Sequence, residues 1–200
     1  MKGSKSVFAP IAVCGIMGSG KNTVCEMMDS ILRKMWIEPR MVAFADPIKQ
    51  VVCEAFNLAD DSEYDTFKRT TVTVDAFGTK VNGRDILRSY GMLMRSYDDT
   101  QFIKYVESEI VRYPNKITLI SDLRFQNEIV WCHLNKIPII KVVSEKSISD
   151  GHVSEKGVPD EDCTFIIRND GTLEELSKKV ETVVKTIIEE RRKNNEARYV

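Results

Sequence analysis

The chain has 200 residues, of which 42% are hydrophobic and 30% are charged, with a formal net charge of -1. This length predicts one domain with a small insertion, and the apolar fraction suffices for a sizeable core. The near-neutral charge and the lack of a long basic stripe argue against nucleic acid and membrane surfaces as partners. No apolar run in the sequence reaches the roughly 18 residues of a membrane-spanning helix.

Five short apolar segments predict the strands of a buried parallel sheet. They are rich in β-branched residues and do not alternate cleanly with polar ones, as expected of strands that are covered on both faces. The segments are 8–16, 40–45, 116–121, 136–143 and 163–168.

Helical patterns separate these strands. Asp46 is predicted to cap the second helix, with Pro47 at its first position. Thr172 and Glu175 form the T-x-x-E pattern of a capping box before the last helix. The predicted helices before the last one cover 21–36, 47–56, 83–97, 99–113 and 124–134. The alternation predicts an α/β fold with a parallel sheet of about five strands and helices on both faces.

Two segments interrupt this alternation. Residues 57–115 carry a loop and two helices between the second and third strands, which predicts a helical substrate-binding insertion. Residues 144–162 are polar and contain Gly and Pro, which predicts a lid-like loop. The cations of this loop are Lys146 and Lys156, and His152 fits a plain loop position better than a catalytic base. We therefore expect a single domain over residues 1–200.

The five cysteines are odd in number and form no C-x-x-C motif, so the pattern favours neither a disulfide framework nor a zinc site. Small buried thiols in a reducing cytoplasm explain them best.

The segment "GIMGSGKNT" follows the first predicted strand and opens the first predicted helix. A Gly-rich turn at this point lets backbone N–H groups surround a phosphate, and Lys21 would reach the β- and γ-phosphates of a nucleotide. A strict phosphate loop has Ser or Thr after the lysine, whereas this chain has Asn22 and then Thr23. The predicted ATP-binding residues of this loop are Gly15, Gly18, Ser19, Gly20, Lys21, Asn22 and Thr23.

A second group of polar residues lies in "SDLRFQNE". Asp122 stands at the carboxyl end of a predicted strand, the edge that faces ligands in open α/β sheets, where an acid can hold Mg²⁺ through water. Arg124 and Glu128 would share a face if 124–134 were helical, and the carboxylate could then aim the guanidinium at a phosphate. An N-capping aspartate and a surface ion pair are the plainer alternative.

Arg84, Arg88 and Arg95 recur at spacings of four and seven residues, on one side of the predicted helix 83–97. Convergent arginines suit a monophosphate, because the planar guanidinium binds two oxygens at once. A solvated basic face explains Arg88 and Arg95 equally well. Phe102 can stack on a base or pack in the core.

Asn169 ends the last predicted strand, before Asp170 and Gly171. It either lines an adenine pocket or forms the turn, and we include it among the predicted ATP-binding residues.

Together these segments resemble the deoxynucleoside monophosphate kinases of bacteriophages, a branch of the P-loop nucleoside monophosphate kinases. The resemblance spans nearly the whole chain, through "GIMGSGKNT", "FADPIKQ", "GRDILRSYG", "SDLRFQNE", "HVSE" and "IIRNDGTLEEL". It implies a P-loop NTPase fold, ATP as co-substrate, Mg²⁺ as cofactor and a deoxynucleoside monophosphate as acceptor. It also implies a cytoplasmic protein, in the host cytoplasm if viral, and leaves a homodimer open.

The resemblance also implies residue roles. The implied catalytic residues are Lys21, Arg84, Asp122, Arg124 and Glu128. The implied metal residues, partly through water, are Asn22, Thr23 and Asp122. The implied monophosphate-binding residues are Lys49, Arg84, Arg88, Arg95, Phe102 and Arg124. Asn22 replaces the aspartate of the G-K-D-T loop that is typical of the family.

Three other functions fit parts of the sequence to different degrees. Animal-type phosphomevalonate kinases resemble the same motif order, although "DLRFQNE" and "HVSE" look more like the phage enzymes. A non-catalytic nucleotide-binding module would explain Asn22 as lost metal chemistry. A nucleic-acid-binding protein is disfavoured by the near-neutral charge.

Overall fold

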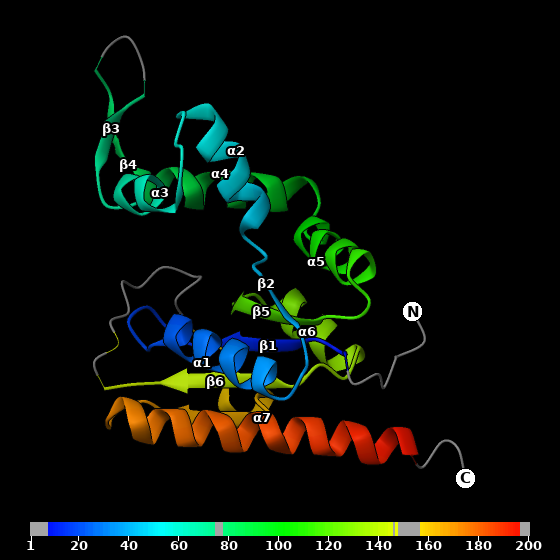
Figure 1. The fold of residues 1–200 in the computed structure, drawn as a ribbon. Helices are drawn as coiled ribbons and strands as arrows, with labels where there is room; N and C mark the ends of the chain where they lie inside the picture. Colours follow the sequence, from blue (N-terminus) through cyan, green and yellow to red (C-terminus); the bar gives the residue numbers. More distant parts are fainter. Residues whose placement is uncertain (1–7, 75–77, 146, 148–156, 197–200) are drawn as a thin grey trace. The chain divides into compact units, whose positions relative to one another are not determined.

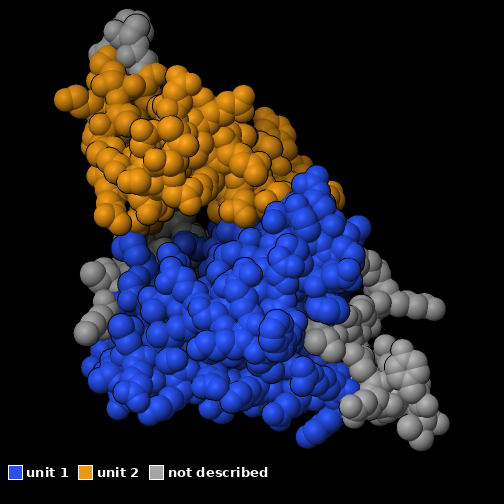
Figure 2. All heavy atoms as spheres, in the orientation of Figure 1, with its two compact units in different colours: residues 1–43, 106–200 blue, residues 44–105 orange. Residues whose placement is uncertain are grey.

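A computed structural model describes residues 8–74, 78–145, 147 and 157–196. The chain divides into two compact units, coloured separately in Figure 2. Unit 1 comprises residues 1–43 and 106–200, and unit 2 comprises residues 44–105. Unit 2 therefore begins before the insertion that was predicted at 57–115.

Unit 1 is built on a parallel sheet of five strands in the order β2-β5-β1-β6-β7. Its strands are β1 Ile11–Cys14, β2 Pro39–Val42, β5 Ile117–Leu123, β6 Ile139–Val143 and β7 Phe165–Arg168. All five correspond to predicted apolar segments, so the predicted α/β fold with a five-stranded parallel sheet is confirmed.

The first strand lies in the middle of the sheet. Ile11 pairs with Leu119 of β5, and Ala12 pairs with Ile139 of β6. Every residue of β1 is buried, which explains why the strand reads as a continuous apolar run. The loop after β1 therefore emerges between two neighbouring strands, at the edge where ligands bind in such sheets.

Helices α1 Lys21–Lys34 and α7 Leu173–Glu196 lie side by side on one face of the sheet (Figure 1). They bury an apolar cluster with alternate residues of the strands, such as Val13 and Leu119. Helix α6 Gln126–Leu134 buries Ile129 and Cys132 outside this cluster. Unit 1 also contains a short 3₁₀ helix, Asp160–Asp162.

Two helix starts differ from the predictions. Helix α2 Asp46–Ala55 already includes Asp46, and Ala45 is its N-cap, so the predicted capping by Asp46 is wrong. Helix α6 begins at Gln126, so Arg124 precedes it and is not on its surface. By contrast, the predicted capping box of α7 is confirmed, because Thr172 N–H donates to Glu175 and Glu175 N–H donates to Thr172 Oγ1.

Unit 2 is mainly helical. It contains α2, α3 Asp61–Phe67, α4 Gly83–Tyr97 and the first residues of α5 Gln101–Arg112. It also contains an antiparallel hairpin of β3 Thr71–Thr73 and β4 Lys80–Asn82, which the sequence did not predict. Helices α2 and α4 pack closely, since a Cβ on Gly91 would lie 2.9 Å from Ile48 Cδ1.

No helix in the described part of the chain is both long and apolar enough to cross a membrane.

Candidate phosphate-binding site

The loop between β1 and α1 has a backbone that requires glycine. The φ angles of Gly15, Gly18 and Gly20 are +147°, +80° and +91°, where residues with a side chain are strained. A Cβ on Gly15 would also lie 2.4 Å from the carbonyl oxygen of Val142. The loop thus passes close to β6, and the glycine pattern seen in the sequence has a steric cause at each of these positions.

Helix α1 begins directly after this loop. Its N-cap is Gly20, which brings no side-chain cap, and its first turn contains no acidic residue. The first N–H groups of a helix have no partner within the helix, and the helix dipole adds partial positive charge there. The start of α1 is therefore suited to an anion such as a phosphate.

Ser19 supplies a separate indication of a ligand. Its side chain is fully buried, and its Oγ has no hydrogen-bond partner among the described residues. Leaving a buried hydroxyl unsatisfied costs about 1–3 kcal/mol, so such groups are rare in folded proteins. A phosphate oxygen bound in the loop would accept a hydrogen bond from this hydroxyl. The residues of the loop therefore fit a bound polyphosphate.

Lys21 lies across the loop. Its Nζ donates a hydrogen bond of 2.8 Å to the carbonyl oxygen of Ile16. The ammonium is therefore held next to the loop backbone, where a phosphate would also meet the N–H groups of α1. Asn22 is exposed and Thr23 is half-buried on the first turn of the same helix.

Asp122 stands near the carboxyl end of β5, as predicted. The next residue, Leu123, pairs with Cys14, which directly precedes the loop. Burial raises the pKa of the Cys25 thiol to about 12, while nearby Lys21 lowers it and nearby Asp122 raises it. The register of β1 on β5 thus places Asp122 beside the end of β1, where the loop begins.

Glu128 caps helix α6, a role that the sequence reading missed. Its Oε2 accepts hydrogen bonds of 3.0 Å from the backbone N–H groups of Arg124 and Phe125, and the residue is 1% exposed. The predicted placement of Arg124 on the same helical face as Glu128 is wrong, because the helix begins two residues after Arg124. Glu128 positions Arg124 through the backbone, and an effect on the guanidinium stays a prediction.

Asn169 reaches the loop from the end of β7. Its Nδ2 donates a hydrogen bond of 3.0 Å to the carbonyl oxygen of Ser19, across 150 residues of sequence. Residues so distant in sequence offer no local pattern, so this contact could not be predicted. A position lining a base stays a prediction.

The predicted monophosphate-binding residues lie in unit 2, apart from Arg124. Arg84, Arg88 and Arg95 are all on α4, as predicted, and Arg88 is 3.7 Å from Asp85. The guanidinium of Arg95 lies 4.3 Å from the ring centroid of Phe102. Phe102 is itself buried, so its predicted stacking on a base stays untested.

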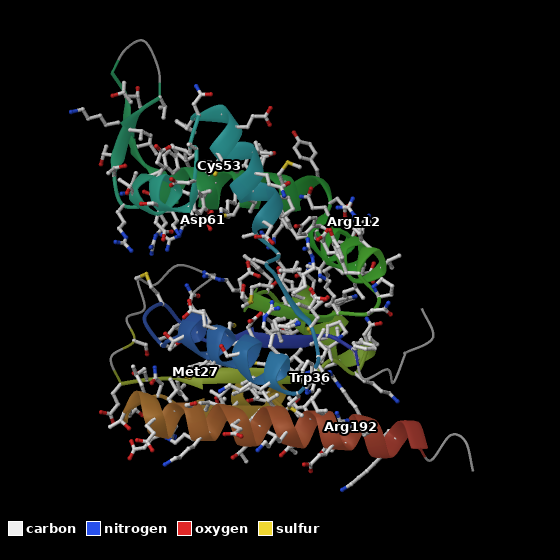
Figure 3. All side chains as sticks on the ribbon, in the orientation of Figure 1. Met27, Trp36, Cys53, Asp61, Arg112 and Arg192 are labelled. Carbon is white, nitrogen blue, oxygen red and sulfur yellow. The ribbon has the colours of Figure 1, made fainter. Side chains whose placement is uncertain are left out.

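Lys49 forms an ion pair of 2.6 Å with Asp61, a residue labelled in Figure 3. This ion pair raises the pKa of Lys49 and keeps the side chain charged. Binding of a monophosphate by Lys49 would therefore compete with an exposed carboxylate.

The predicted lid contains the remaining candidate residues of the sequence. Lys146, His152 and Lys156 of the predicted lid at 144–162 lie outside the described residues.

Within the described residues, no group of three or more His, Cys, Asp or Glu side chains could hold a metal ion. The five cysteines are free thiols, and Cys14, Cys25 and Cys132 are buried.

Comparison with known proteins finds similarity to one kinase family. Residues 102–180 match the family described as deoxynucleotide monophosphate kinase. A curated protein of Acanthamoeba polyphaga mimivirus, named "Putative deoxynucleotide monophosphate kinase", is 32% identical over 130 residues, which are 59% of this chain and 65% of that protein. The chain thus spans slightly less than two thirds of this relative. The resemblance predicted from the motifs is confirmed, and both names indicate a phosphotransferase.

A solved structure is also similar. Dephospho-CoA kinase from Campylobacter jejuni matches 90% of this chain and 97% of its own, with 14% identity and a TM-score of 0.49.

Proposed function

We propose that this chain, similar to deoxynucleotide monophosphate kinases, transfers the γ-phosphoryl group of ATP to a deoxynucleoside 5′-monophosphate. The products are ADP and the deoxynucleoside diphosphate. The observation that carries the proposal is the glycine loop before α1, with its buried and unpartnered Ser19 hydroxyl. The family match supports the choice of acceptor.

The chemistry of this reaction fits the residues present. The acceptor is a phosphate oxygen that is already anionic near neutral pH, so no strong general base is needed. Phosphoryl transfer depends instead on alignment and on positive charge around the transferring group. The loop amides and Lys21 provide these features for the donor triphosphate.

Mg²⁺ is part of this proposal. We assign Thr23, Asn22 and Asp122 to the ion, because oxygen atoms are the hard ligands that suit Mg²⁺, which keeps several waters. When bound, the ion would neutralise charge on the β- and γ-phosphates. Because Mg²⁺ keeps several waters, it needs only a few protein ligands. This agrees with the lack of a larger acidic cluster among the described residues.

The acceptor phosphate is assigned to arginines. Arg84, Arg88 and Arg95 lie on one helix of unit 2, and guanidinium groups bind phosphate oxygens in pairs. Arg124 follows Asp122 and is assigned to the acceptor or the transferring phosphate. Arg84, in the first turn of α4, is the residue for a first test.

The decisive experiment is a coupled assay of ADP release with ATP, Mg²⁺ and a panel of acceptors. The panel contains deoxynucleoside monophosphates, ribonucleoside monophosphates and phosphomevalonate. The proposal expects turnover with one or more deoxynucleoside monophosphates. Turnover with phosphomevalonate alone would assign another metabolite kinase, and ATP binding without any turnover would assign a non-catalytic module.

Lys21→Ala should lower turnover by about a hundredfold or more, because it removes a charge that stabilises the transferring phosphate. Lys34→Ala is a matched control, since Lys34 is an exposed lysine in the last turn of the same helix. Equal turnover of the two variants would contradict the assignment of the loop.

Arg84→Ala should raise the KM for the monophosphate about tenfold or more and leave the KM for ATP unchanged. Arg69→Ala, an exposed arginine of the same unit, is the control. An increase in the KM for ATP alone would contradict the site assignment.

A further inference from the structure

The side chain of Asn169 joins the β7–α7 turn to the phosphate loop, residues 15–20 between β1 and α1. Its amide donates to the Ser19 carbonyl at 3.0 Å. The same amide lies against Gly20, where a Cβ would come within 2.3 Å of Asn169 Nδ2. Asn169 thus touches two consecutive loop residues, and the contact exists because residue 20 has no side chain.

The turn that carries Asn169 is itself firmly held. Asn169 N–H donates to the Val143 carbonyl at 2.8 Å, and Asp170 Oδ1 accepts from Glu145 N–H at 2.8 Å. Lys179 Nζ donates to the Arg168 carbonyl at 2.9 Å. The turn is therefore bound to β6 on one side and to α7 on the other, and can serve as a fixed support for the loop.

The hydrogen bond has a directional consequence for the loop. In a trans peptide the C=O and N–H groups point in opposite directions. The structure contains no cis peptide among the described residues. Fixing the Ser19 carbonyl toward Asn169 therefore fixes the Gly20 N–H in the opposite direction. Gly20 N–H is one of the loop amides that a bound phosphate would meet.

We propose that Asn169 is a positioning residue that sets the phosphate-binding shape of the loop. In this role it acts on the triphosphate through Ser19 and Gly20, and not through a contact with the base. The proposal rests on the proposed function, in which this loop binds the triphosphate of ATP.

The test compares ligands with and without a base. Dissociation constants for ATP, inorganic tripolyphosphate and adenosine are measured by calorimetry for the wild type, Asn169→Ala and Asn169→Asp. Asn169→Asp keeps the shape of the side chain but loses the donor. Asn169→Ala should weaken ATP and tripolyphosphate by a similar factor, about tenfold for one lost hydrogen bond, and leave adenosine binding unchanged. Asn169→Asp should weaken ATP and tripolyphosphate further, because its carboxylate repels the phosphates.

Asn135→Ala is a matched control. Asn135 Nδ2 also donates to a backbone carbonyl, that of Trp131, at 2.9 Å, but at the end of α6. This variant loses an equivalent hydrogen bond and should keep the wild-type affinity for tripolyphosphate. If Asn169→Ala weakens ATP and adenosine but not tripolyphosphate, Asn169 lines the base and the proposal is wrong.

Amide hydrogen exchange provides a readout without ligand. Asn169→Ala should speed the exchange of the Gly20 and Lys21 amides in the folded protein, whereas Asn135→Ala should not. Unchanged exchange would overturn the proposal. A wild type that binds neither ATP nor tripolyphosphate would instead refute the proposed function, while the exchange rates would still decide whether Asn169 positions the loop.

Discussion

Gly20→Ala tests the steric account of the phosphate loop most directly. Alanine at φ +91° is strained by roughly 1–2 kcal/mol. Its Cβ would also lie 2.3 Å from Asn169 Nδ2, and overpacking of this kind costs about 1–3 kcal/mol. The free energy of unfolding should therefore fall by about 2–5 kcal/mol, which lowers Tm by roughly 4–20 °C for a chain of this size.

Gly78→Ala separates the two contributions. Gly78 has a similar φ of +79°, but nothing lies within 4 Å of its expected Cβ. Gly78→Ala should therefore lower the free energy of unfolding only by the backbone strain, roughly 1–2 kcal/mol. Both variants are measured by urea denaturation followed by circular dichroism and by thermal unfolding. If Gly20→Ala costs no more than Gly78→Ala, the predicted clash with Asn169 does not exist.

A double variant locates the clash. Asn169→Ala removes the amide that the new methyl group would meet. In the Gly20→Ala background, Asn169→Ala should lower the free energy of unfolding by at least about 1 kcal/mol less than it does in the wild type. Additive effects of the two substitutions would refute the close approach of these residues.

Three further predictions concern a helix cap, two buried thiols and an exposed tryptophan. Glu128→Gln removes the charge that two backbone amides bind, so the free energy of unfolding should fall by about 1–2 kcal/mol in urea titrations. Burial raises the pKa of Cys25 and Cys132 from 9.0 to about 12. Above pH 9 the unfolded chain releases these protons and the folded chain retains them. The free energy of unfolding should therefore fall by up to about 1.4 kcal/mol per thiol for each pH unit between pH 9 and 12. Trp36→Gly should stabilise the protein by about 1 kcal/mol, because Trp36 is 98% exposed with a φ of +61° (Figure 3).

Each of these predictions has a control. Glu174→Gln changes an exposed glutamate and should leave the free energy of unfolding nearly unchanged. Cys132→Ala should flatten the alkaline loss of stability, and an equally steep loss would contradict the assigned cause. Trp36→Ala keeps a side chain at positive φ and should gain less than Trp36→Gly. Equal gains for the two would show that strain at this position is not the reason.

The strands of the sheet could be predicted because burial on both faces imposes a simple composition. Ile117 to Ile120 are all fully buried, so this stretch has no solvent-facing position that would call for charge. The β3–β4 hairpin could not be found in this way. The residues of both strands are exposed or half-buried, so neither strand contains the continuous apolar run that marks a buried strand.

The candidate site was predictable where the backbone itself imposes the residue type. Gly15 and Gly20 follow from the path of the loop, and their spacing from Lys21 is visible in the sequence. The capping role of Glu128 was not predictable, because it depends on α6 beginning at Gln126, two residues later than the sequence pattern indicated. Likewise, the contact of Asn169 with Ser19 depends on tertiary structure alone.

The position of unit 2 in the chain has a consequence for how this protein can evolve. Strands β2 and β5 are neighbours, with Val42 opposite Ile120, yet the whole of unit 2 is inserted between them. In the unfolded chain, where this connection is flexible, each doubling of its length adds only about 0.6 kcal/mol to the cost of bringing its ends together. Lengthening, shortening or exchange of unit 2 would therefore cost the sheet little. Unit 2 can therefore diversify while the register of β2 on β5 and the phosphate loop are inherited unchanged.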